Sequence, residues 1–405
     1  MQTCRPLPPE TCDASVASGL GRYAGILADP FVSSTKTYAV IKVAVVGLGK
    51  MGLSHYAVVN AHPDVEVAGI CDSSGYVLGV LKKYTGVTTY SDFDTMLDKA
   101  DLDAVVIATP SSSHAKMVRA ALERGLHVFC EKPFTLNPQD ANALATLGDE
   151  RGLVTQVGYH NRFIGAFQEV KRLLDLGAIG EVTHVLGEAY GPVVLKPKGG
   201  TWRSQRTEGG GCLYDYAAHV LDLVSWYVGE PVGVGGTALN SVFSREIDDE
   251  VFSTLYYPQG ATAQISVNWS DESYRKMTTR ITVWGTKGRI FVDRQECQVY
   301  LRDTATPPAG YERGWNVRYT TELTEPVWFY LRGEEYSAQI SAFVQRVKER
   351  RTDGVNRFDS AGATDKIIAM LIADAEKGAS TAARGGTVLE PVHPKRSKRL
   401  RLWRR

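Results

Sequence analysis

Apolar runs of strand length alternate with amphipathic stretches between residues 40 and 160. The apolar runs, rich in Val and Ile, predict buried strands at 40–46, 65–72, 103–110, 126–133 and 153–159. The stretches between them predict helices at 52–62, 75–86, 114–125 and 138–152. Strands that alternate with helices of this length form βαβ units, so this part of the chain is predicted to be an α/β domain with a parallel sheet.

A different pattern begins near residue 163, where longer strands with alternating apolar and polar residues have few helices between them. Such strands are predicted at 182–191, 261–271 and 280–301, and late helices at 337–350 and 359–379. Alternation is typical of an antiparallel sheet with one buried face, which leaves the other face for a partner subunit. We therefore expect two domains, one at 41–162 and a second at 163–390 with a large open, mostly antiparallel sheet.

Charge is distributed unevenly along the 405 residues, although the formal net charge is only +1. The last eleven residues, KRSKRLRLWRR, contain seven Lys or Arg and no acid, which leaves a mildly acidic remainder. An acidic body argues against a nucleic-acid-binding face, and the basic tail at 391–405 is either a solvated terminus or a tether to an anionic surface. Residues 1–40 show no helical or strand period and are predicted to be a disordered or draped extension.

The cysteines and the apolar runs limit the compartment and the kind of site. Six cysteines are scattered without CxxC or metal-finger spacing, which is typical of reduced thiols and predicts no metal site. No run approaches the roughly 18 apolar residues that a membrane span needs. We therefore expect a cytoplasmic protein without a membrane span.

A glycine-rich turn follows the first predicted strand. GLGKMG places Gly47, Gly49 and Gly52 in G-x-G-x-x-G spacing between a buried strand and a helix, the context in which this spacing binds a dinucleotide. Glycines let the backbone approach a pyrophosphate, and the helix N-terminus supplies N–H groups and a positive dipole. Asp72 ends the second strand, where a carboxylate accepts hydrogen bonds from a ribose diol. The domain at 41–162 is therefore predicted to be an NAD-binding Rossmann domain.

The residues after Asp72 bear on the choice between NAD and NADP. They are Ser73 and Ser74, with no Arg to receive a 2′-phosphate, so NAD is expected and NADP is less favoured. Lys82 or Lys83 could still reach such a phosphate. The expected cofactor-binding residues are Gly47, Gly49, Lys50, Met51, Gly52, Asp72, Ser73, Thr109, Pro110, His114, Glu131 and Lys132.

A charged pair follows another predicted strand in FCEKPFTL. Glu131 and Lys132 come at the carboxyl end of that strand, the edge where open α/β sheets hold their ligands. The Lys132-Pro133 peptide bond is predicted to be cis, because this minority state persists where a tight turn must aim a particular group.

A second charged group lies in GGGCLYDYAAHVLDLVSWYVG. Asp215, His219 and Asp222 have the i, i+4 and i+7 spacing that places side chains on one helix face. An imidazole flanked by acids suits a group that must take up a proton. We therefore interpret His219 as a candidate for proton transfer.

These motifs and their order resemble the glucose-fructose oxidoreductase, inositol dehydrogenase and rhizopine catabolism (Gfo/Idh/MocA) family of oxidoreductases. The resemblance runs from about Ile41 to Val388 and is carried by AVVGLGKMG, ICDSS, ATPSSSHA, CEKPFTLNPQDA, VGYHNRF, GAIGEV, TWRSQRTEGGGCLYDYAAHVLDLVSW and GTKGRIFVD. It implies the two domains described above, with the second sheet buried in a homodimer or homotetramer. It also implies that the catalytic residues are Lys132, Asp215 and His219.

The predicted activity is hydride transfer between a nicotinamide and a secondary carbinol or ketone carbon of a sugar, a sugar derivative or a cyclitol. His219 would be the general base in oxidation, Lys132 would stabilise the developing alkoxide, and Asp215 would orient the substrate or the histidine. Arg162 or Arg203 could bind an anionic group or form ordinary ion pairs. The expected substrate-binding residues are Lys132, Tyr159, Asn161, Arg162, Trp202, Arg203, Asp215 and His219.

Two other interpretations remain open at this point. The same fold also serves a regulator that senses a ligand without turnover, although such a protein does not need Lys132, Asp215 and His219 together. A dehydrogenase of the same fold could also act on a substrate that is not a sugar, such as a trans-dihydrodiol or an imine.

Overall fold

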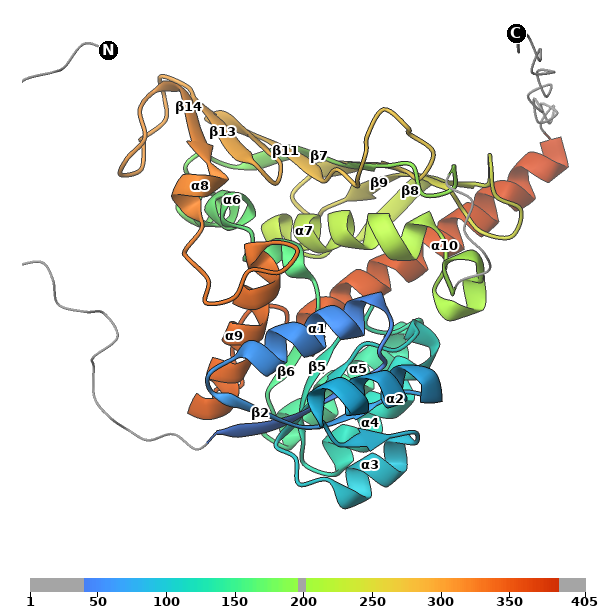
Figure 1. The fold of residues 1–405 in the computed structure, drawn as a ribbon. Coiled ribbons are helices and arrows are strands. Elements are labelled where there is room, and N and C mark those ends of the chain that lie inside the picture. The colour runs from blue at the N-terminus through green and yellow to red at the C-terminus, as the bar shows by residue number, and fades with distance from the viewer. Residues whose placement is uncertain (1–39, 196–201, 386–405) are drawn as a thin grey trace, which may run out of the picture. The chain divides into compact units, whose positions relative to one another are not determined.

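Two β-sheets organise the residues that the computed structural model describes, which are 40–195 and 202–385 (Figure 1). The first sheet is parallel and the second is mostly antiparallel, which confirms the predicted α/β fold. The predicted basic tail and all but the last residue of the predicted extension lie outside the described residues.

The first sheet has six parallel strands in the order β3-β2-β1-β4-β5-β6. Its strands are β1 (Ile41–Val46), β2 (Val65–Cys71), β3 (Thr89–Tyr90), β4 (Ala104–Ile107), β5 (His127–Cys130) and β6 (Thr155–Val157). The helices that connect them are α1 (Lys50–Ala61), α2 (Gly75–Thr85), α3 (Phe93–Lys99), η1 (Ser111–Ser113), α4 (His114–Glu123) and α5 (Pro138–Glu150). Strand order reverses between β1 and β4, and the crevice at the carboxyl ends of such strands is where open α/β sheets bind ligands.

Both faces of this sheet are buried, which is why its strands are continuous apolar runs in the sequence. Successive side chains of a strand point to opposite faces, so alternate residues of β1 enter different cores. Val43 and Val45 pack with residues of α1 and of a late helix, α9 (Glu334–Glu349). Ala44 and Val46 pack with residues of α3, α4 and α5. Burial on both sides holds the carboxyl ends of the strands in place.

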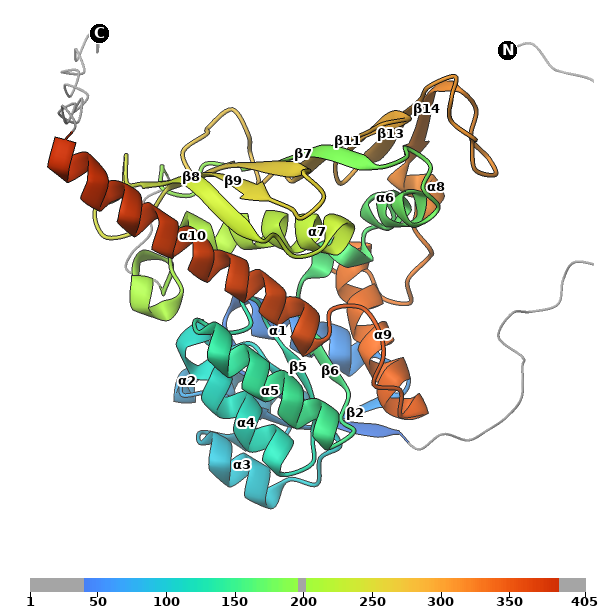
Figure 2. The same cartoon turned by 180° about the vertical axis from the view of Figure 1, so that it is seen from behind.

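The second sheet has eight strands in the order β14-β13-β12-β11-β7-β10-β9-β8. The β7–β10 pair is parallel, and the other neighbouring pairs of this sheet are antiparallel. Its strands are β7 (Val182–Tyr190), β8 (Gly233–Asn240), β9 (Glu250–Tyr256), β10 (Thr262–Asn268), β11 (Arg280–Gly285), β12 (Gly288–Val292), β13 (Glu296–Leu301) and β14 (Gly314–Tyr319). Helices α6 (Gly165–Asp175), α7 (Ala218–Val228) and α10 (Phe358–Gly385) cover one of its faces (Figures 1 and 2).

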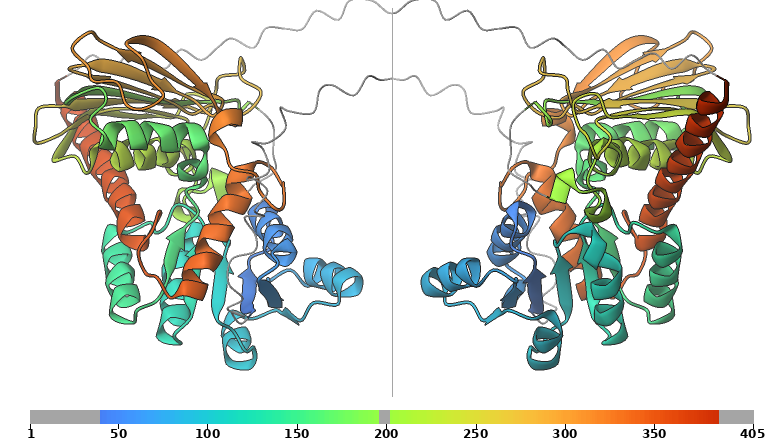
Figure 3. Two further views of the ribbon diagram at one scale, coloured as in Figure 1. Left: turned by 90° about the vertical axis from the view of Figure 1, so that its left-hand side faces the viewer. Right: turned by 90° about the vertical axis from the view of Figure 1, so that its right-hand side faces the viewer.

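The last two long helices link the second sheet to the first domain. Ile340 and Phe343 of α9 enter the same core as β1 and α1, and α10 packs against both α5 and β8 (Figure 3). The predicted second domain therefore contributes two helices to the packing of the first. Shorter elements between the two sheets are η2 (His160–Phe163), η3 (Trp202–Ser204), η4 (Arg206–Glu208), the π-helical turn η5 (Leu213–Ala217) and α8 (Thr320–Leu323).

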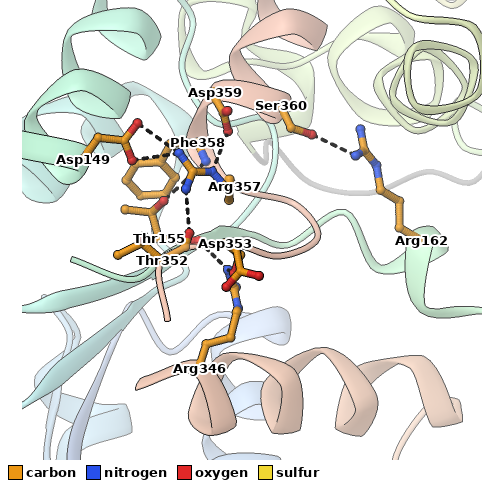
Figure 4. A network of polar contacts seen from close by, with 10 residues as sticks. All are labelled: Asp149, Thr155, Arg162, Arg346, Thr352, Asp353, Arg357, Phe358, Asp359 and Ser360. Atoms are coloured by element: carbon orange, nitrogen blue, oxygen red, sulfur yellow. Dashed lines mark hydrogen bonds and ion pairs between the residues drawn. The ribbon is translucent and has the colours of Figure 1, made fainter. Parts of the chain in front are cut away.

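Two arginines fasten the segment that joins α9 to α10 (Figure 4). Arg357 donates from Nη2 to both carboxylate oxygens of Asp149, at 2.8 and 2.9 Å, and so ties the start of α10 to α5. Arg346 of α9 donates to the backbone carbonyl of Asp353 at 3.2 Å. These contacts hold the start of α10 against α5 of the first domain.

Within the described ranges, no helix combines the length and the apolar composition needed to cross a membrane. The four cysteines of this part of the chain, Cys71, Cys130, Cys212 and Cys297, are buried free thiols. Among the described residues there is also no group of His, Cys, Asp and Glu arranged to hold a metal ion.

A buried carboxyl on α10 is expected to make stability fall as the pH rises. Asp365 accepts hydrogen bonds from the Thr135 backbone N–H and hydroxyl, at 2.8 and 3.0 Å, and burial outweighs these bonds and raises its pKa to about 8. The native state therefore keeps a proton that the unfolded chain loses above a pH of about 4. Between those two pH values, the free energy of unfolding of the wild type should fall by roughly 1.4 kcal/mol per pH unit more than that of Asp365→Asn. The amide oxygen of the Asn variant can still accept the hydrogen bond from Thr135.

Urea unfolding at pH 5, 6 and 7 measures this difference. The same dependence of unfolding free energy on pH in wild type and variant would contradict the proton on Asp365.

Candidate active site

A cavity of about 1260 Å³, here called the central pocket, is lined by residues from the carboxyl ends of the first sheet's strands and by residues of the second domain. The predicted site residues on its wall are Gly47, Gly49, Lys50, Met51, Asp72, Ser73, Thr109, Pro110, Glu131, Lys132, Trp202, Arg203, Asp215 and His219. Gly52, His114, Tyr159, Asn161 and Arg162 do not line it. The fold thus brings the glycine turn and the predicted catalytic residues to one pocket.

The three glycines of the turn have different reasons to lack a side chain. Gly47 has φ of +83°, and a Cβ there would lie 2.8 Å from backbone atoms of Ala108 and Thr109. A Cβ at Gly52 would lie 1.6 Å from the Gly47 carbonyl oxygen, so this glycine permits the close packing of α1 on the turn that follows β1. A Cβ at Gly49 would meet nothing within 4 Å.

Open space at Gly49 identifies the place where a ligand can approach the backbone. Gly49 is the N-cap of α1, lines the central pocket, and its residue type offers no side-chain hydrogen bond to the first turn. The N–H groups at the start of α1 are thus available to an anion, and the helix dipole favours one. The turn fits the pyrophosphate of a dinucleotide.

Asp72 lines the same pocket at the end of β2. Its carboxylate accepts hydrogen bonds from the backbone N–H groups of Leu48 and Ser74, the second at 2.7 Å. Each carboxylate oxygen can accept more than one hydrogen bond, so Asp72 keeps the capacity to bind ribose hydroxyls.

Glu131 is a buried carboxylate that supports the turn carrying Lys132. It lies 2.6 Å from Nε2 of His55 on α1 and accepts from the Lys132 backbone N–H at 3.1 Å. Burial opposes its ionisation, but its hydrogen bond to His55 and the charges of His55 and Lys132 outweigh burial and lower the pKa of Glu131. The Lys132-Pro133 peptide bond is cis, which confirms the prediction. Glu131 therefore orients the backbone from which the lysine side chain leaves.

Lys132 and Asp215 form an ion pair between the two domains. The lysine Nζ donates to Asp215 Oδ1 at 2.7 Å and to the Asp215 backbone carbonyl at 3.1 Å, while Arg203 donates from Nε to Oδ2 at 3.1 Å. Burial disfavours the Asp215 carboxylate, but the charges of Lys132 and Arg203 outweigh it and lower its pKa to about 2. An ammonium group has three donors, so two are engaged by Asp215 and one remains for a ligand in the central pocket.

His219 lies in the first turn of α7, directly after the π-helical turn that carries Asp215. It is 4 % exposed, and its Nδ1 has no hydrogen-bond partner among the described residues. Its ring centroid is 4.8 Å from that of His160. Burial, reinforced by the charges of Lys132 and Arg294, lowers the pKa of His219 well below its ordinary value. The imidazole is therefore neutral at neutral pH and able to accept a proton.

The sequence expectations for Arg162 and Asp222 need correction. The two form a buried pair, with Nη2 2.7 Å from Oδ1 and Nε 3.0 Å from Oδ2, and Nη1 of Arg162 also donates to Ser360 (Figure 4). Asp215 and His219 line the central pocket, whereas Asp222, three residues after His219 in α7, is buried against Arg162 instead. Arg162 is thus committed to this ion pair and is absent from the pocket wall.

Tyr159, Asn161 and His114 are predicted site residues that do not line the central pocket, and all three are buried. Tyr159 and Asn161 are fully buried, and Asn161 Oδ1 accepts from Arg294 at 3.3 Å. His114 joins two strand ends, with Nε2 3.0 Å from the Thr109 carbonyl and Nδ1 3.0 Å from the Pro133 carbonyl. In η2 it is His160, between the two buried neighbours, that reaches the pocket.

Several pocket residues had not been expected from the sequence. They include His160, Arg275, Lys276, Arg294, Arg332, Glu335 and Tyr336. His160 lies inside the VGYHNRF motif and could have been included with its neighbours. The others follow β10, follow β12, or lie just before or in the first turn of α9, in segments with no local motif that marks a site.

Two family models match most of the part of the chain that forms the two domains. The family model described as "Oxidoreductase family, NAD-binding Rossmann fold" matches residues 41–159, and "GFO/IDH/MocA C-terminal domain" matches residues 167–291. Scyllo-inositol 2-dehydrogenase (NAD(+)) from Bacillus subtilis (strain 168) is 28% identical over 257 residues, which are 62% of this chain and 73% of that protein. A 2,7-anhydro-N-acetylneuraminate hydratase from Escherichia coli (strain K12) is 29% identical over 272 residues, which are 65% of this chain and 70% of that protein.

Among solved structures, levoglucosan dehydrogenase in complex with NADH and levoglucosan aligns with a TM-score of 0.74 at 23% identity, covering 83% of this chain and 97% of that one. This likeness supports the fold. The two family models together span more than half of the chain and confirm the predicted class, an oxidoreductase that uses NAD. The chain therefore belongs to the Gfo/Idh/MocA family of oxidoreductases.

Proposed function

We propose that the protein is a dehydrogenase that transfers a hydride between NAD and a secondary alcohol or ketone carbon of a sugar, a sugar derivative or a cyclitol. The observation that carries this proposal is the meeting of Lys132, Asp215 and His219 on the wall of a pocket that also contains the glycine turn. An ammonium donor and a neutral imidazole in one pocket are what oxidation of a carbinol requires.

Lys132 would bind the reacting oxygen. Its remaining N–H can donate to the substrate hydroxyl, and its positive charge stabilises the alkoxide that develops as the proton leaves. Asp215 keeps the ammonium in place through the 2.7 Å contact. Arg203 is a second partner of the same carboxylate and donates to its other oxygen. Asp215 is thus proposed to position Lys132, whereas the sequence had suggested that it orients the substrate or the histidine.

His219 would take the proton of the hydroxyl in oxidation and return it in reduction. It is buried and neutral, and Nδ1 has no described partner, so the imidazole can change protonation state without breaking an ion pair. Gly49, Lys50 and Asp72 are proposed to hold the cofactor. When bound, NAD would accept the hydride that leaves the carbinol carbon.

The relatives include a dehydrogenase and a hydratase, so the choice of reaction depends on the site itself. Incubating the protein with NAD and a panel of sugars, cyclitols and nucleotide sugars, while following the absorbance of reduced cofactor, tests it directly. We expect reduced cofactor to accumulate with at least one polyol. Conversion of a substrate without a net change in the cofactor would favour a hydratase, and binding without any conversion in either direction would favour a ligand-sensing regulator.

Cofactor choice is expected to depend on Asp72. Lys82 and Lys83 do not line the central pocket, and Asp72 does, so a 2′-phosphate would meet a carboxylate there. Like charges a few Å apart repel by roughly 1–4 kcal/mol at a protein surface, so NADH should bind at least about tenfold more tightly than NADPH. Asp72→Ala should reduce the ratio of NADH affinity to NADPH affinity. Glu66→Gln, a change at an exposed residue of β2, should leave that ratio unchanged.

Fluorescence titration of both reduced cofactors measures the ratio. Equal or tighter binding of NADPH to the wild type would contradict the role of Asp72.

We also propose that the open face of the second sheet binds a partner subunit in a homodimer or homotetramer. Alternate residues of β9 and β14, including Tyr256, Trp315 and Tyr319, expose 46%, 61% and 52% of their surfaces, whereas an intervening residue such as Leu255 is buried. Exposed aromatic side chains on one face favour an interface with another protein chain. A cytoplasmic location remains a prediction, which the four buried free thiols support.

A further inference from the structure

Positive charge is in excess on the part of the pocket wall that residues 160–336 supply, here called the substrate wall. It carries five cationic side chains and two carboxylates. The cations are Arg203, Arg275, Lys276, Arg294 and Arg332, and the carboxylates are Asp215 and Glu335. Lys132 adds another cation from the opposite domain.

Both carboxylates of the substrate wall are already paired. Asp215 contacts Lys132 at 2.7 Å and Arg203 at 3.1 Å, and Glu335 forms an ion pair with Arg294. The three other cations, Arg275, Lys276 and Arg332, have no carboxylate partner within the described part of the chain. A pocket with uncompensated charge of one sign concentrates ligands of the opposite sign.

A chain of ring contacts links Arg332 to the proposed catalytic imidazole. Its guanidinium lies 5.3 Å from the centre of the Tyr336 ring, which stacks at 5.0 Å on His160, and His160 is 4.8 Å from His219. Arg332 also has φ of +68°, a left-handed conformation that is uncommon for a residue other than glycine. A strained backbone at a pocket wall is found where a side chain must be held in a particular place.

Arg275 and Lys276 belong to the loop between β10 and β11, which is anchored beside η5. The Thr278 backbone N–H donates to the Tyr190 carbonyl at 2.9 Å, and a Cβ built at Gly191 would lie 2.8 Å from the Tyr216 hydroxyl and 3.4 Å from Met277 Cα. The loop is therefore next to the helical turn that carries Asp215. Its cations line the same pocket as Asp215 and His219, whereas the cofactor pyrophosphate has the glycine turn and the start of α1.

We propose that the substrate carries an anionic group, a carboxylate or a phosphate, and that Arg332 together with Arg275 and Lys276 binds it. The proposal deepens the proposed dehydrogenase function and names its substrate class as an anionic sugar. Guanidinium groups bind carboxylate and phosphate through paired hydrogen bonds, and so distinguish such a sugar from its neutral counterpart.

Calorimetric titration of the NADH-saturated protein tests the subsite without requiring turnover. The probes are D-glucuronate for a carboxylate, D-glucose 6-phosphate for a phosphate and D-glucose as the neutral control. At least one anionic probe should bind roughly tenfold or more tightly than glucose, and the preference should weaken in 0.5 M NaCl. Which anion binds better distinguishes carboxylate from phosphate. Equal binding of all three probes would overturn the proposal.

Variants assign the effect to the named residues. Arg332→Gln and the double variant Arg275→Gln/Lys276→Gln should each reduce the affinity for the anionic probe at least about fivefold and leave that for glucose unchanged. Arg313→Gln, an exposed arginine outside the central pocket, is the matched control and should change neither. Unaltered probe affinity in both test variants would overturn the proposal.

A titration of NADH onto each variant separates substrate from cofactor. The affinity for NADH should stay within about twofold of wild type in every variant. If Arg332→Gln weakened NADH binding instead of probe binding, the cation would serve the cofactor pyrophosphate and the proposal would be wrong. Absence of turnover with a polyol panel would count against the dehydrogenase alone, since the probe titrations do not depend on it.

Discussion

Replacement of Lys132 by Met should lower kcat/KM for alcohol oxidation by roughly 10³-fold or more, equivalent to about 4 kcal/mol of barrier. The change removes the one ammonium donor that the fold directs from the first domain to Asp215 and leaves the developing alkoxide without a positive charge. Met has a similar length and no charge, so the pocket keeps its shape. Affinity for NADH should change little, because the glycine turn and Asp72 are unaltered.

A paired variant separates lost catalysis from lost folding. Lys132→Met leaves the buried Asp215 carboxylate with Arg203 alone, and breaking a buried pair destabilises proteins by about 3–5 kcal/mol. The double variant Lys132→Met/Asp215→Asn removes that uncompensated charge and should recover thermal stability without recovering turnover. Full activity in the double variant would show that Lys132 acts only by keeping Asp215 buried.

Replacement of His219 by Asn should reduce turnover by roughly 10²–10⁴, the usual contribution of general acid and base catalysis, or about 3–5 kcal/mol. Asn keeps a polar group of similar size but cannot accept and hold a proton. NADH affinity should again be retained, since His219 belongs to α7 in the second domain.

The dependence of kcat/KM on pH distinguishes a base from a structural histidine. A protonated imidazole cannot accept the hydroxyl proton, so activity must fall as the pH decreases through the pKa of His219. Because burial and the charges of Lys132 and Arg294 lower that pKa, the fall should come below the ordinary histidine value of about 6.5. The variant should lack this fall. The same acidic limb at a near-normal rate in His219→Asn would assign the base to another group.

The Lys132 and His219 side chains interact electrostatically, so a change at one should alter the titration of the other. The charge of Lys132 contributes to the low pKa of His219, so Lys132→Met should move the acidic limb of the residual activity towards higher pH. An unshifted limb would mean that the two groups do not interact in the working enzyme.

Local patterns in the chain were sufficient for the first sheet, the glycine turn and the Lys132 turn. Strands such as β1 and β4 are buried on both faces and so appear as unbroken apolar runs, while the spacing of Gly47, Gly49 and Gly52 depends on backbone sterics within one turn. The cis bond before Pro133 is likewise a property of two adjacent residues. Each of these features depends on contacts between near neighbours, which a linear pattern records.

The composition of the pocket wall depended on contacts between distant parts of the chain. Asp215 meets Lys132 across 83 residues, and Arg162 is withdrawn from the pocket by Asp222, 60 residues away. The turn that carries Asp215, η5, is π-helical, and the spacing of its residues in the sequence does not reveal this. Arg332 and Glu335 reach the wall because α9 packs back on β1 and α1, and Glu335 pairs with Arg294, which follows β12. Charges pair according to distance in the folded chain, so only the tertiary structure decided which cations were compensated and which remained available to a ligand.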